Sequence, residues 1–240
     1  KQAFIDDELN EKFRLTSANS INISRLVPQT FYYFNAYAQL KREGKKDVVF
    51  SVPSGNFGNI GAGLLAWKMG LPAKQFIAAT NANDTVPEFF KTGVYQPKPS
   101  VATLSNAMDV GNPSNWVRIM NLFRDDLQEL KKVISAVSYT DEQTRTAVNT
   151  VFQKYNYVVC PHTAIAWLAI ENYRKQFNDT TSAGLFLSTA HPCKFPDVYE
   201  GAIAESVIIP EQVRSLEGKP KQAVEMKADF AMFKDYLLNN

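Results

Sequence analysis

The stretch that decides the fold is SVPSGNFGNIGAGLLAWKMG, residues 51–70. The β-branched run KKDVVFSV leads into it, so the chain leaves a predicted strand as the stretch begins. Four glycines then fall within nine residues, and the helical pattern LLAWKM follows them. A strand, a glycine-rich turn and a helix start bring backbone N–H groups and the positive end of the helix dipole together. This arrangement is typical of an anion-binding site.

The glycines allow more than one interpretation, and one alternative is a tight turn with no ligand. A P-loop is excluded because no Gly-Lys-Ser/Thr sequence follows the glycines. Residues 61–66, GAGLLA, fit the dinucleotide fingerprint G-x-G-x-x-A, but they come after the turn, where small residues favour close helix–strand packing. The acid expected about 20 positions later is poorly matched by Asn81 or Asp84. The turn at 54–59, with its two asparagines, suits a single terminal phosphate better than a pyrophosphate.

Composition limits the class of protein. The 240 residues are enough for one large domain or two small ones. A formal net charge of +2 argues against nucleic-acid and membrane-surface partners, and no apolar run approaches the roughly 20 residues that span a bilayer. Cys160 and Cys193 are the only cysteines, which excludes a disulfide scaffold and predicts a cytoplasmic location. The chain opens without Met in an amphipathic pattern, so we expect it to be part of a longer protein.

Helices and strands alternate along the chain. Apolar patterns predict strands at 47–52, 74–81 and 183–190. Helical spacing predicts helices in the intervening segments, at 27–44, 59–70, 84–93, 116–137, 141–155 and 162–177, and again at 197–207 and 224–238. Strands separated by helices predict an α/β fold with a mostly parallel sheet flanked by helices.

Five segments together resemble one enzyme family. They are SANSINISRLVPQTFYYF (17–34), the glycine turn SVPSGNFGNIGAG (51–63), FIAATNANDTVPEFF (76–90), TLSNAMDVGNPSNW (103–116) and LFLSTAHPCKF (185–195). Their sequences and their order are similar to those of the threonine synthase family, pyridoxal-phosphate (PLP) enzymes of fold type II with a core like that of tryptophan synthase β. The resemblance implies a PLP cofactor and the conversion of O-phospho-L-homoserine and water to L-threonine and phosphate, the last step of threonine biosynthesis.

The resemblance covers the whole chain but only part of the family's pattern. The family's Schiff-base lysine, in a Phe-Lys-Asp-like segment, and its second glycine-rich loop are not found in residues 1–240. The resemblance therefore implies the C-terminal part of the PLP enzyme domain, incomplete at the N-terminus, inactive alone and without a catalytic residue of its own. Its expected partners are the N-terminal part of the same protein, the small-molecule substrate and a second copy of itself. We expect a phosphate-loop part at 14–95, a mainly helical part at 96–180, and a last strand with C-terminal helices at 181–240.

The resemblance also assigns cofactor-binding roles. The residues that hold the cofactor phosphate, mainly through backbone N–H groups, are Gly55, Asn56, Phe57, Gly58 and Asn59. Thr189 ends a predicted strand, where ligands of α/β sheets gather, and by resemblance it faces the pyridine nitrogen. A hydroxyl partner does not keep that nitrogen protonated as an aspartate does, so the ring becomes a milder electron sink.

The segment ANSINISR carries the candidates for the substrate phosphate, which are Asn19, Ser20, Asn22 and Arg25. Taken alone, Arg25 reads as an exposed arginine after a turn. Its planar guanidinium is nevertheless suited to phosphate, and by resemblance Ser20 and Arg25 match residues that bind the substrate's phosphate.

Two Cys-Pro-His-type motifs raise the possibility of a zinc site or a Cys–His dyad. Cys160-Pro-His162 and His191-Pro-Cys193 are spaced too closely for a usual zinc site, and no third group orients a Cys–His dyad, so we predict no metal. We interpret the cysteines as small buried hydrophobic residues and expect His191 beside the ring site. The alternative function is a noncatalytic nucleotide- or phosphate-binding α/β module built on residues 61–66.

Overall fold

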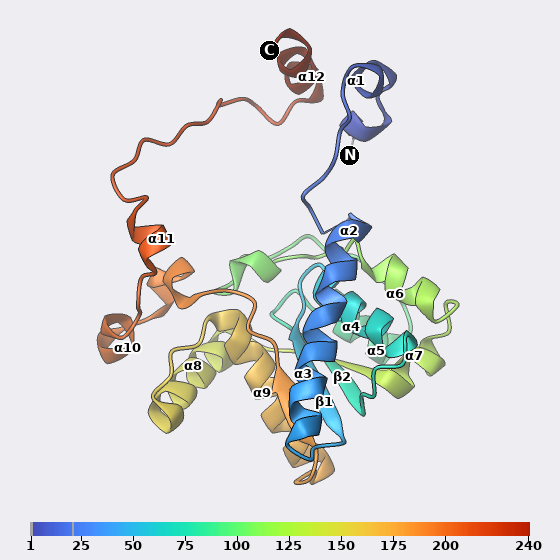
Figure 1. Ribbon diagram of the computed structural model, residues 1–240, viewed down its shortest axis with the longest axis vertical. Helices are drawn as coiled ribbons and strands as arrows, with labels where there is room; N and C mark the ends of the chain where they lie inside the picture. Colours follow the sequence, from blue (N-terminus) through green and yellow to red (C-terminus); the bar gives the residue numbers. More distant parts are fainter. Residues whose placement is uncertain (1, 21) are drawn as a thin grey trace. The chain divides into compact units, whose positions relative to one another are not determined.

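The computed structural model describes residues 2–20 and 22–240, which form two compact units (Figure 1). The smaller unit comprises Lys1–Asn19 and Ile209–Asn240, and the larger comprises Ser20–Ile208. In the smaller unit, the ammonium of Lys234 lies 2.9 Å from carboxylate oxygens of both Asp6 and Glu8. Within the described residues, no helix has the length and apolar character to cross a bilayer. The expected division at 14–95, 96–180 and 181–240 stays a prediction.

The larger unit is built on a parallel sheet, as the alternation of strands and helices predicts. Its strands are β1 (Val48–Pro53), β2 (Gln75–Thr80), β3 (Ile134–Ser138) and β4 (Ala183–Phe186). They lie in the order β3-β2-β1-β4, and each neighbouring pair is parallel. All the carboxyl ends therefore lie along one edge, where α/β folds bind their ligands.

Helices connect and cover these strands. Those of the larger unit are α2 (Ile23–Leu26), α3 (Thr30–Arg42), α4 (Gly58–Lys68), α5 (Thr85–Thr92), α6 (Trp116–Leu122), α7 (Leu127–Val133), α8 (Asp141–Tyr155), α9 (Pro161–Phe177) and α10 (Gly201–Glu205). Those of the smaller unit are α1 (Asp7–Lys12), α11 (Glu211–Arg214) and α12 (Phe230–Asn239). Short 3-10 turns occupy Gln2–Ile5, Val27–Gln29, Asn106–Met108, Pro192–Lys194 and Pro196–Val198.

Both faces of the sheet are covered, and the alternation of side chains along β1 shows how. Val48, Phe50 and Val52 join the apolar cluster that holds α3 and α4, whereas Val49 joins the cluster formed with α9 (Figure 1). Successive strand residues point to opposite faces. A strand buried on both faces is therefore continuously apolar, as VVFSV nearly is.

The helix predicted at 116–137 is interrupted between α6 and α7, and its last residues, 134–137, form a strand instead. The chain leaves α6 through Arg124 and Asp125, both in the left-handed conformation at φ of 54° and 58°, so the helix cannot continue. The Asp126 carboxylate then accepts from the N–H groups of Gln128 and Glu129 and starts α7. Residues 134–138 form β3, whose apolar residues occur at a spacing that fits a helix as well as a buried strand. The predicted apolar stripe on 116–130 is confirmed as core.

Gly63 provides a stability test of the packing of α4 against the sheet. A Cβ at Gly63 would lie 2.6 Å from Cζ of Tyr33 and 2.8 Å from a ring carbon of Phe76, and both rings are fully buried. A Cβ at Gly61 would meet Ile119 and Leu26 at 3.7–3.9 Å, which is ordinary contact. We expect Gly63→Ala to lower the free energy of unfolding by about 2 kcal/mol through overpacking. Gly61→Ala, the matched control, should raise it by up to about 1 kcal/mol. Thermal unfolding measures both, and equal effects would contradict this packing.

Candidate functional site

The glycine turn lies where β1 ends and α4 begins. Ser54 extends the β1–β2 ladder by one bond, because its N–H donates to the carbonyl of Ala79 at 2.8 Å. The chain then turns through residues 55–57 and enters α4 at Gly58. The first bond back along the helix joins the N–H of Gly61 to the carbonyl of Phe57 at 3.1 Å. The turn is thus fixed by backbone bonds on both sides.

The backbone N–H groups inside this turn are the main chemical feature of the site. Within the part of the chain that the structure describes, the hydrogen bonds give no acceptor to the N–H groups of residues 55–59. The turn also lies at the N-terminus of an 11-residue helix, which carries positive dipole charge. Unpaired N–H donors at such a point match the requirements of a phosphate or carboxylate. That these donors converge on one anion stays a prediction.

Phe57 makes the turn possible and also anchors it. Its backbone is left-handed at φ 58°, and its ring is 2% exposed and packs edge-on against Trp116 at 5.5 Å between centroids. A left-handed phenylalanine is uncommon, and burial of the ring offsets its backbone cost. Any contact of Phe57 with an anion therefore comes from its backbone, as the sequence predicts.

Asn56 ties the turn to two other segments. Its amide Nδ2 donates to Ser20 Oγ at 2.6 Å, and its Oδ1 accepts from both the N–H and the hydroxyl of Ser114. Its carbonyl accepts from Nδ2 of Asn115 at 3.0 Å. Asn56 is consequently a structural anchor of the turn, and one of its amide hydrogens is already committed to Ser20. Asn59 accepts the Tyr33 hydroxyl at both its carbonyl and its Oδ1.

Met108 forms a wall against the turn. A Cβ at Gly55 would lie 2.7 Å from Cα and 3.1 Å from the carbonyl oxygen of Met108, so the two backbones touch. Side-chain bonds hold the Met108 segment in place: Asp109 accepts from Thr103, from Asn81 and from Asn83. This polar network at the carboxyl end of β2 leaves the wall little freedom to move.

The four predicted substrate residues are placed differently. Ser20 lies against the turn through its bond to Asn56, as described above. Asn22 is the N-cap of α2, with its Oδ1 accepting from the N–H of Ser24 at 3.0 Å, and Arg25 is an exposed residue of that helix. Asn19 belongs to the smaller unit. The structure therefore brings Ser20 to the turn, and the substrate roles of all four stay predictions.

Thr189 follows β4, which ends at Phe186, earlier than the predicted strand end at 190. Leu187 still donates to the carbonyl of Ser51 at 3.0 Å, so this segment leaves the sheet beside β1 and the glycine turn. The next two hydroxyls then contact the first turn of α9: Ser188 accepts from Thr163 at 3.2 Å, and Thr189 Oγ1 lies 3.5 Å from Nδ1 of His162. Thr189 is therefore on the edge of the sheet that carries the turn.

His162 is the titratable group nearest to Thr189. It is 4% exposed, its ring packs edge-on against Phe195, and burial lowers its pKa to about 4, against a weaker opposing effect of the Ser105 backbone. The imidazole is therefore neutral at pH 7. His191 is exposed, and its Nδ1 accepts from the N–H of Cys193 within a local turn. Cys160 is buried and caps α9, and among the described residues no group of three potential metal ligands occurs.

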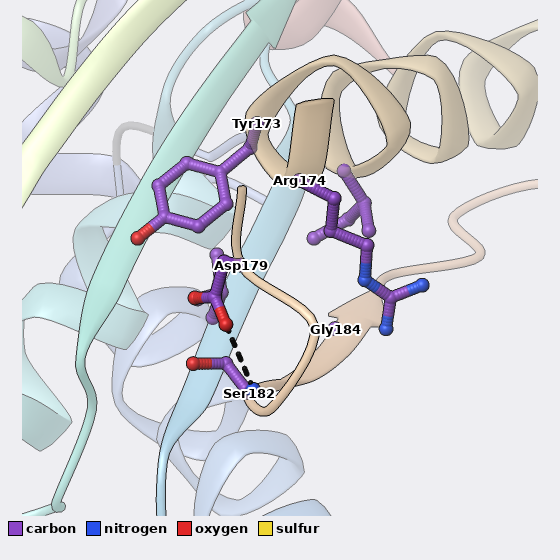
Figure 2. A pocket seen from close by; sticks show the side chains of 7 residues that line it. Tyr173, Arg174, Asp179, Ser182 and Gly184 are labelled. Atoms are coloured by element: carbon purple, nitrogen blue, oxygen red, sulfur yellow. Dashed lines mark hydrogen bonds between the residues drawn. The ribbon is translucent and has the colours of Figure 1, made fainter. Parts of the chain in front are cut away.

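A pocket at the opposite end of the strands has a structural role. Asp179 accepts from the N–H of Ser182 at 3.0 Å, beside Tyr173 and Arg174 (Figure 2). The same carboxylate pairs with the ammonium of Lys74 at 2.7 Å. The Lys74 ammonium holds the pKa of this carboxyl well below its usual range. The space between the residues drawn is too small for a water molecule. These contacts fix the amino ends of β2 and β4, away from the glycine turn.

Residues of the site to which the sequence assigned no cofactor or substrate role come mainly from two segments. Ser114, Asn115 and Arg118 surround Asn56 and Ser20, with Arg118 donating to Asn115 Oδ1 at 2.6 Å. His162 meets Thr189 from α9. The polar run GNPSN before an apolar helix was a usable signal for the first group. His162 was considered only within the Cys160-Pro-His162 motif, which gives no signal for a contact with Thr189.

Two family models match the chain. The model described as "Pyridoxal-phosphate dependent enzyme" matches residues 10–188, and the model described as "Threonine synthase, C-terminal" matches residues 163–237. Among curated proteins, the threonine synthase of Escherichia coli is 45% identical over 240 residues, which is 100% of this chain and 55% of the relative. The chain thus spans about half the length of the curated relatives it matches.

Solved structures give the same result. The crystal structure of threonine synthase from Escherichia coli superposes with a TM-score of 0.87 at 44% identity, covering 99% of this chain and 54% of that one. The structure of PLP-bound threonine synthase from Brucella melitensis gives a TM-score of 0.84 at 29% identity, covering 98% and 55%. The predicted resemblance and the predicted fold type are confirmed.

Proposed function

The chain belongs to the family of pyridoxal-phosphate dependent enzymes, and from that premise we propose that it supplies the C-terminal half of a threonine synthase. The observation that supports this most is the glycine turn, where a strand end and a helix N-terminus coincide with N–H groups that have no acceptor among the described residues. The similarity to threonine synthases along the full chain supports the particular activity. The substrate would be O-phospho-L-homoserine, and the products L-threonine and phosphate.

The residues at the turn fit the phosphate of PLP. Gly55 sits so close to Met108 that no side chain has room there, which leaves the backbone itself as the binding surface. Residues 55–59 offer N–H donors, and the bonds of Asn56 to Ser20 and Ser114 hold them in position before a ligand arrives. Preorganised donors lose little entropy on binding. Gly55, Asn56, Phe57, Gly58 and Asn59 are therefore the proposed phosphate cradle.

Thr189 is the proposed partner of the pyridine nitrogen. It lies on the sheet edge that carries the cradle, and the residue is exposed. When bound, PLP withdraws electrons from the substrate's carbon atoms, and a hydroxyl partner makes this withdrawal milder than a carboxylate would. The chain's own residues orient the ring and leave the proton-transferring lysine to the other half of the enzyme.

The substrate's phosphate would bind on the Ser20 side of the cradle. Ser20 is joined to Asn56, and Arg118 approaches its carbonyl at 3.4 Å, so a polar surface extends from the cradle toward α2. Arg25 on α2 supplies a guanidinium that can bind phosphate through two parallel bonds. Asn19 and Asn22 complete the proposed set. The departing phosphate would remain next to these residues.

The N-terminal half of the enzyme would cover the outer side of β4. In the described residues β4 is the last strand of the sheet, and Tyr155, Tyr157 and Phe186 beside it are 52%, 60% and 37% exposed. They line a hollow of about 270 Å³. An unpaired strand edge flanked by aromatic rings favours association with another chain segment. The half of the relatives that this chain does not span is the proposed occupant.

The positions of the fingerprint glycines do not support the alternative of a nucleotide-binding module. Gly61 and Gly63 of its fingerprint lie inside α4 and not in the turn, and Gly63 is needed there for the close packing against Tyr33 and Phe76. A cytoplasmic location stays a prediction from the two free cysteines.

The proposed function is tested with the full-length protein that contains this chain. We expect it to take up PLP, seen as visible absorbance above that of the apoprotein, and to release phosphate from O-phospho-L-homoserine while forming threonine. A protein that takes up no PLP would contradict the proposal. PLP uptake without threonine formation would support the proposed cofactor and contradict the proposed substrate.

Arg25 separates the two phosphate sites. In the full-length enzyme, Arg25→Ala should lower kcat/KM for O-phospho-L-homoserine by roughly thirtyfold, about 2 kcal/mol, mainly through KM, because a charge-assisted bond to the substrate is lost. PLP affinity should not change. Arg14→Ala, a change of another exposed arginine, is the control. Loss of PLP with normal KM would show that Arg25 serves the cofactor.

A further inference from the structure

His162 is a buried polar group that the proposed function has not used. Its Nε2 is buried and has no hydrogen-bond partner among the described residues, and its Nδ1 lies 3.5 Å from Thr189 Oγ1. A buried ring nitrogen without a partner is costly, and native proteins retain few such groups without a role. The side chain in contact with its Nδ1 is that of the residue proposed to face the pyridine ring.

The surroundings of His162 fix the ring rather than leave it free. Pro161 begins α9, Cys160 caps that helix, and Phe195 packs edge-on against the imidazole with centroids 5.0 Å apart. Thr189, in contrast, is exposed and follows the end of its strand. A rigid ring therefore meets a hydroxyl that otherwise rotates among staggered positions.

We propose that His162 is a positioning residue that orients the Thr189 hydroxyl toward the pyridine ring of the cofactor. As acceptor, Nδ1 takes the hydroxyl hydrogen and turns the oxygen lone pairs outward. As donor, it occupies one lone pair and leaves the hydrogen to point outward. Either way the imidazole excludes part of the rotation of the hydroxyl before the cofactor binds. This inference rests on the proposed function, because it needs Thr189 at the cofactor ring.

The charged groups around the ring agree with a neutral histidine. Burial lowers the pKa of His162 most strongly, and Lys194 lowers it further. The Ser105 backbone and Asp109 act in the opposite direction and raise this pKa. A neutral imidazole can exchange a hydrogen bond with a hydroxyl without placing a fixed positive charge beside a pyridine nitrogen.

Three substitutions in the full-length PLP-loaded enzyme separate positioning from packing. His162→Phe keeps the ring and removes both nitrogens. His162→Asn leaves a polar atom near the place of Nδ1 but creates a cavity. Thr163→Val, the matched control, breaks the adjacent bond to Ser188 on the same helical turn. The readouts are the dissociation constant of PLP, the ¹⁵N chemical shift of ¹⁵N-labelled PLP at the pyridine nitrogen, and the melting temperature.

We expect the variants with a lower melting temperature to differ from the variant with altered PLP binding and an altered ¹⁵N signal. His162→Phe should melt no lower than wild type, because it removes an unpaired buried nitrogen, yet it should shift the pyridine ¹⁵N signal and weaken PLP binding about three- to tenfold. His162→Asn should melt lower but keep the wild-type ¹⁵N signal. Thr163→Val should lower stability without moving that signal. In a Thr189→Val background, His162→Phe should have no further effect on PLP.

The outcomes are distinguishable. A wild-type ¹⁵N signal and PLP affinity in His162→Phe would overturn this inference and leave the proposed function intact. A ¹⁵N shift that follows melting temperature through all three variants would also overturn it, since packing would then explain the effect. A full-length protein that takes up no PLP would overturn both.

Discussion

Gly55→Ala in the full-length enzyme should weaken PLP binding by about a hundredfold, or about 3 kcal/mol. The added Cβ would lie 2.7 Å from Cα of Met108, and neither backbone can move away without disturbing the hydrogen bonds that hold it. Asp109 and Asn81 hold the Met108 segment, while Asn56 holds the turn. The turn must therefore open, and its N–H groups lose their preorganised positions. PLP titration followed by absorbance measures the loss.

Gly61→Ala is the matched control for Gly55→Ala. It adds the same methyl group six residues later in the same motif, where the nearest side-chain carbons are 3.7 Å away. Its PLP affinity should equal that of the wild type. If Gly55→Ala also binds PLP normally, the turn is not the cradle. If both variants lose PLP equally, the motif acts through the stability of α4 and not through the turn.

The 240-residue chain alone should give no measurable turnover of O-phospho-L-homoserine. Reactions on PLP need a lysine at the cofactor that moves protons, and the two lysines that follow the glycine turn in sequence, Lys68 and Lys74, are poorly placed for it. Lys68 ends α4, at the far end of the helix from the cradle, and its ammonium lies over the rings of Trp67 and Phe123. Lys74 is paired with Asp179 at the amino ends of the strands. Phosphate release from the purified chain measures this directly.

The same preparation should associate with itself or with the N-terminal half. The exposed aromatic side of β4 favours this, and the mass in solution reports it. Adding the separately produced N-terminal half should restore turnover. Full activity from a PLP-loaded monomer of this chain would contradict the account.

The sequence predicts the glycine turn well because every local signal agrees there. A β-branched run, glycines and a helical pattern require strand, turn and helix in that order, and β1 and α4 follow it closely. The segment 116–137 fails because a period-based reading cannot separate a short buried strand from a helix. What decides between them is the left-handed pair Arg124 and Asp125, and left-handed backbone is not visible in charged residues of a surface turn.

Contacts between distant segments account for what the sequence could not predict at the site. Asn56 was assigned to the ligand, and only the fold shows that Ser20 and Ser114 occupy its side chain. His162 lies 27 residues from Thr189 in sequence, and α9 packs against the sheet with its first turn beside the segment that follows β4, which brings the two residues together. Residue type suggested which groups can do chemistry, whereas topology decides which of them meet.

The most direct test of the proposed cofactor site is a crystal structure of the full-length protein with PLP bound. We predict that the oxygens of its phosphate accept hydrogen bonds from the backbone N–H groups of residues 55–59, with the pyridine nitrogen beside Thr189. A phosphate bound elsewhere, with these N–H groups facing solvent, would contradict the account.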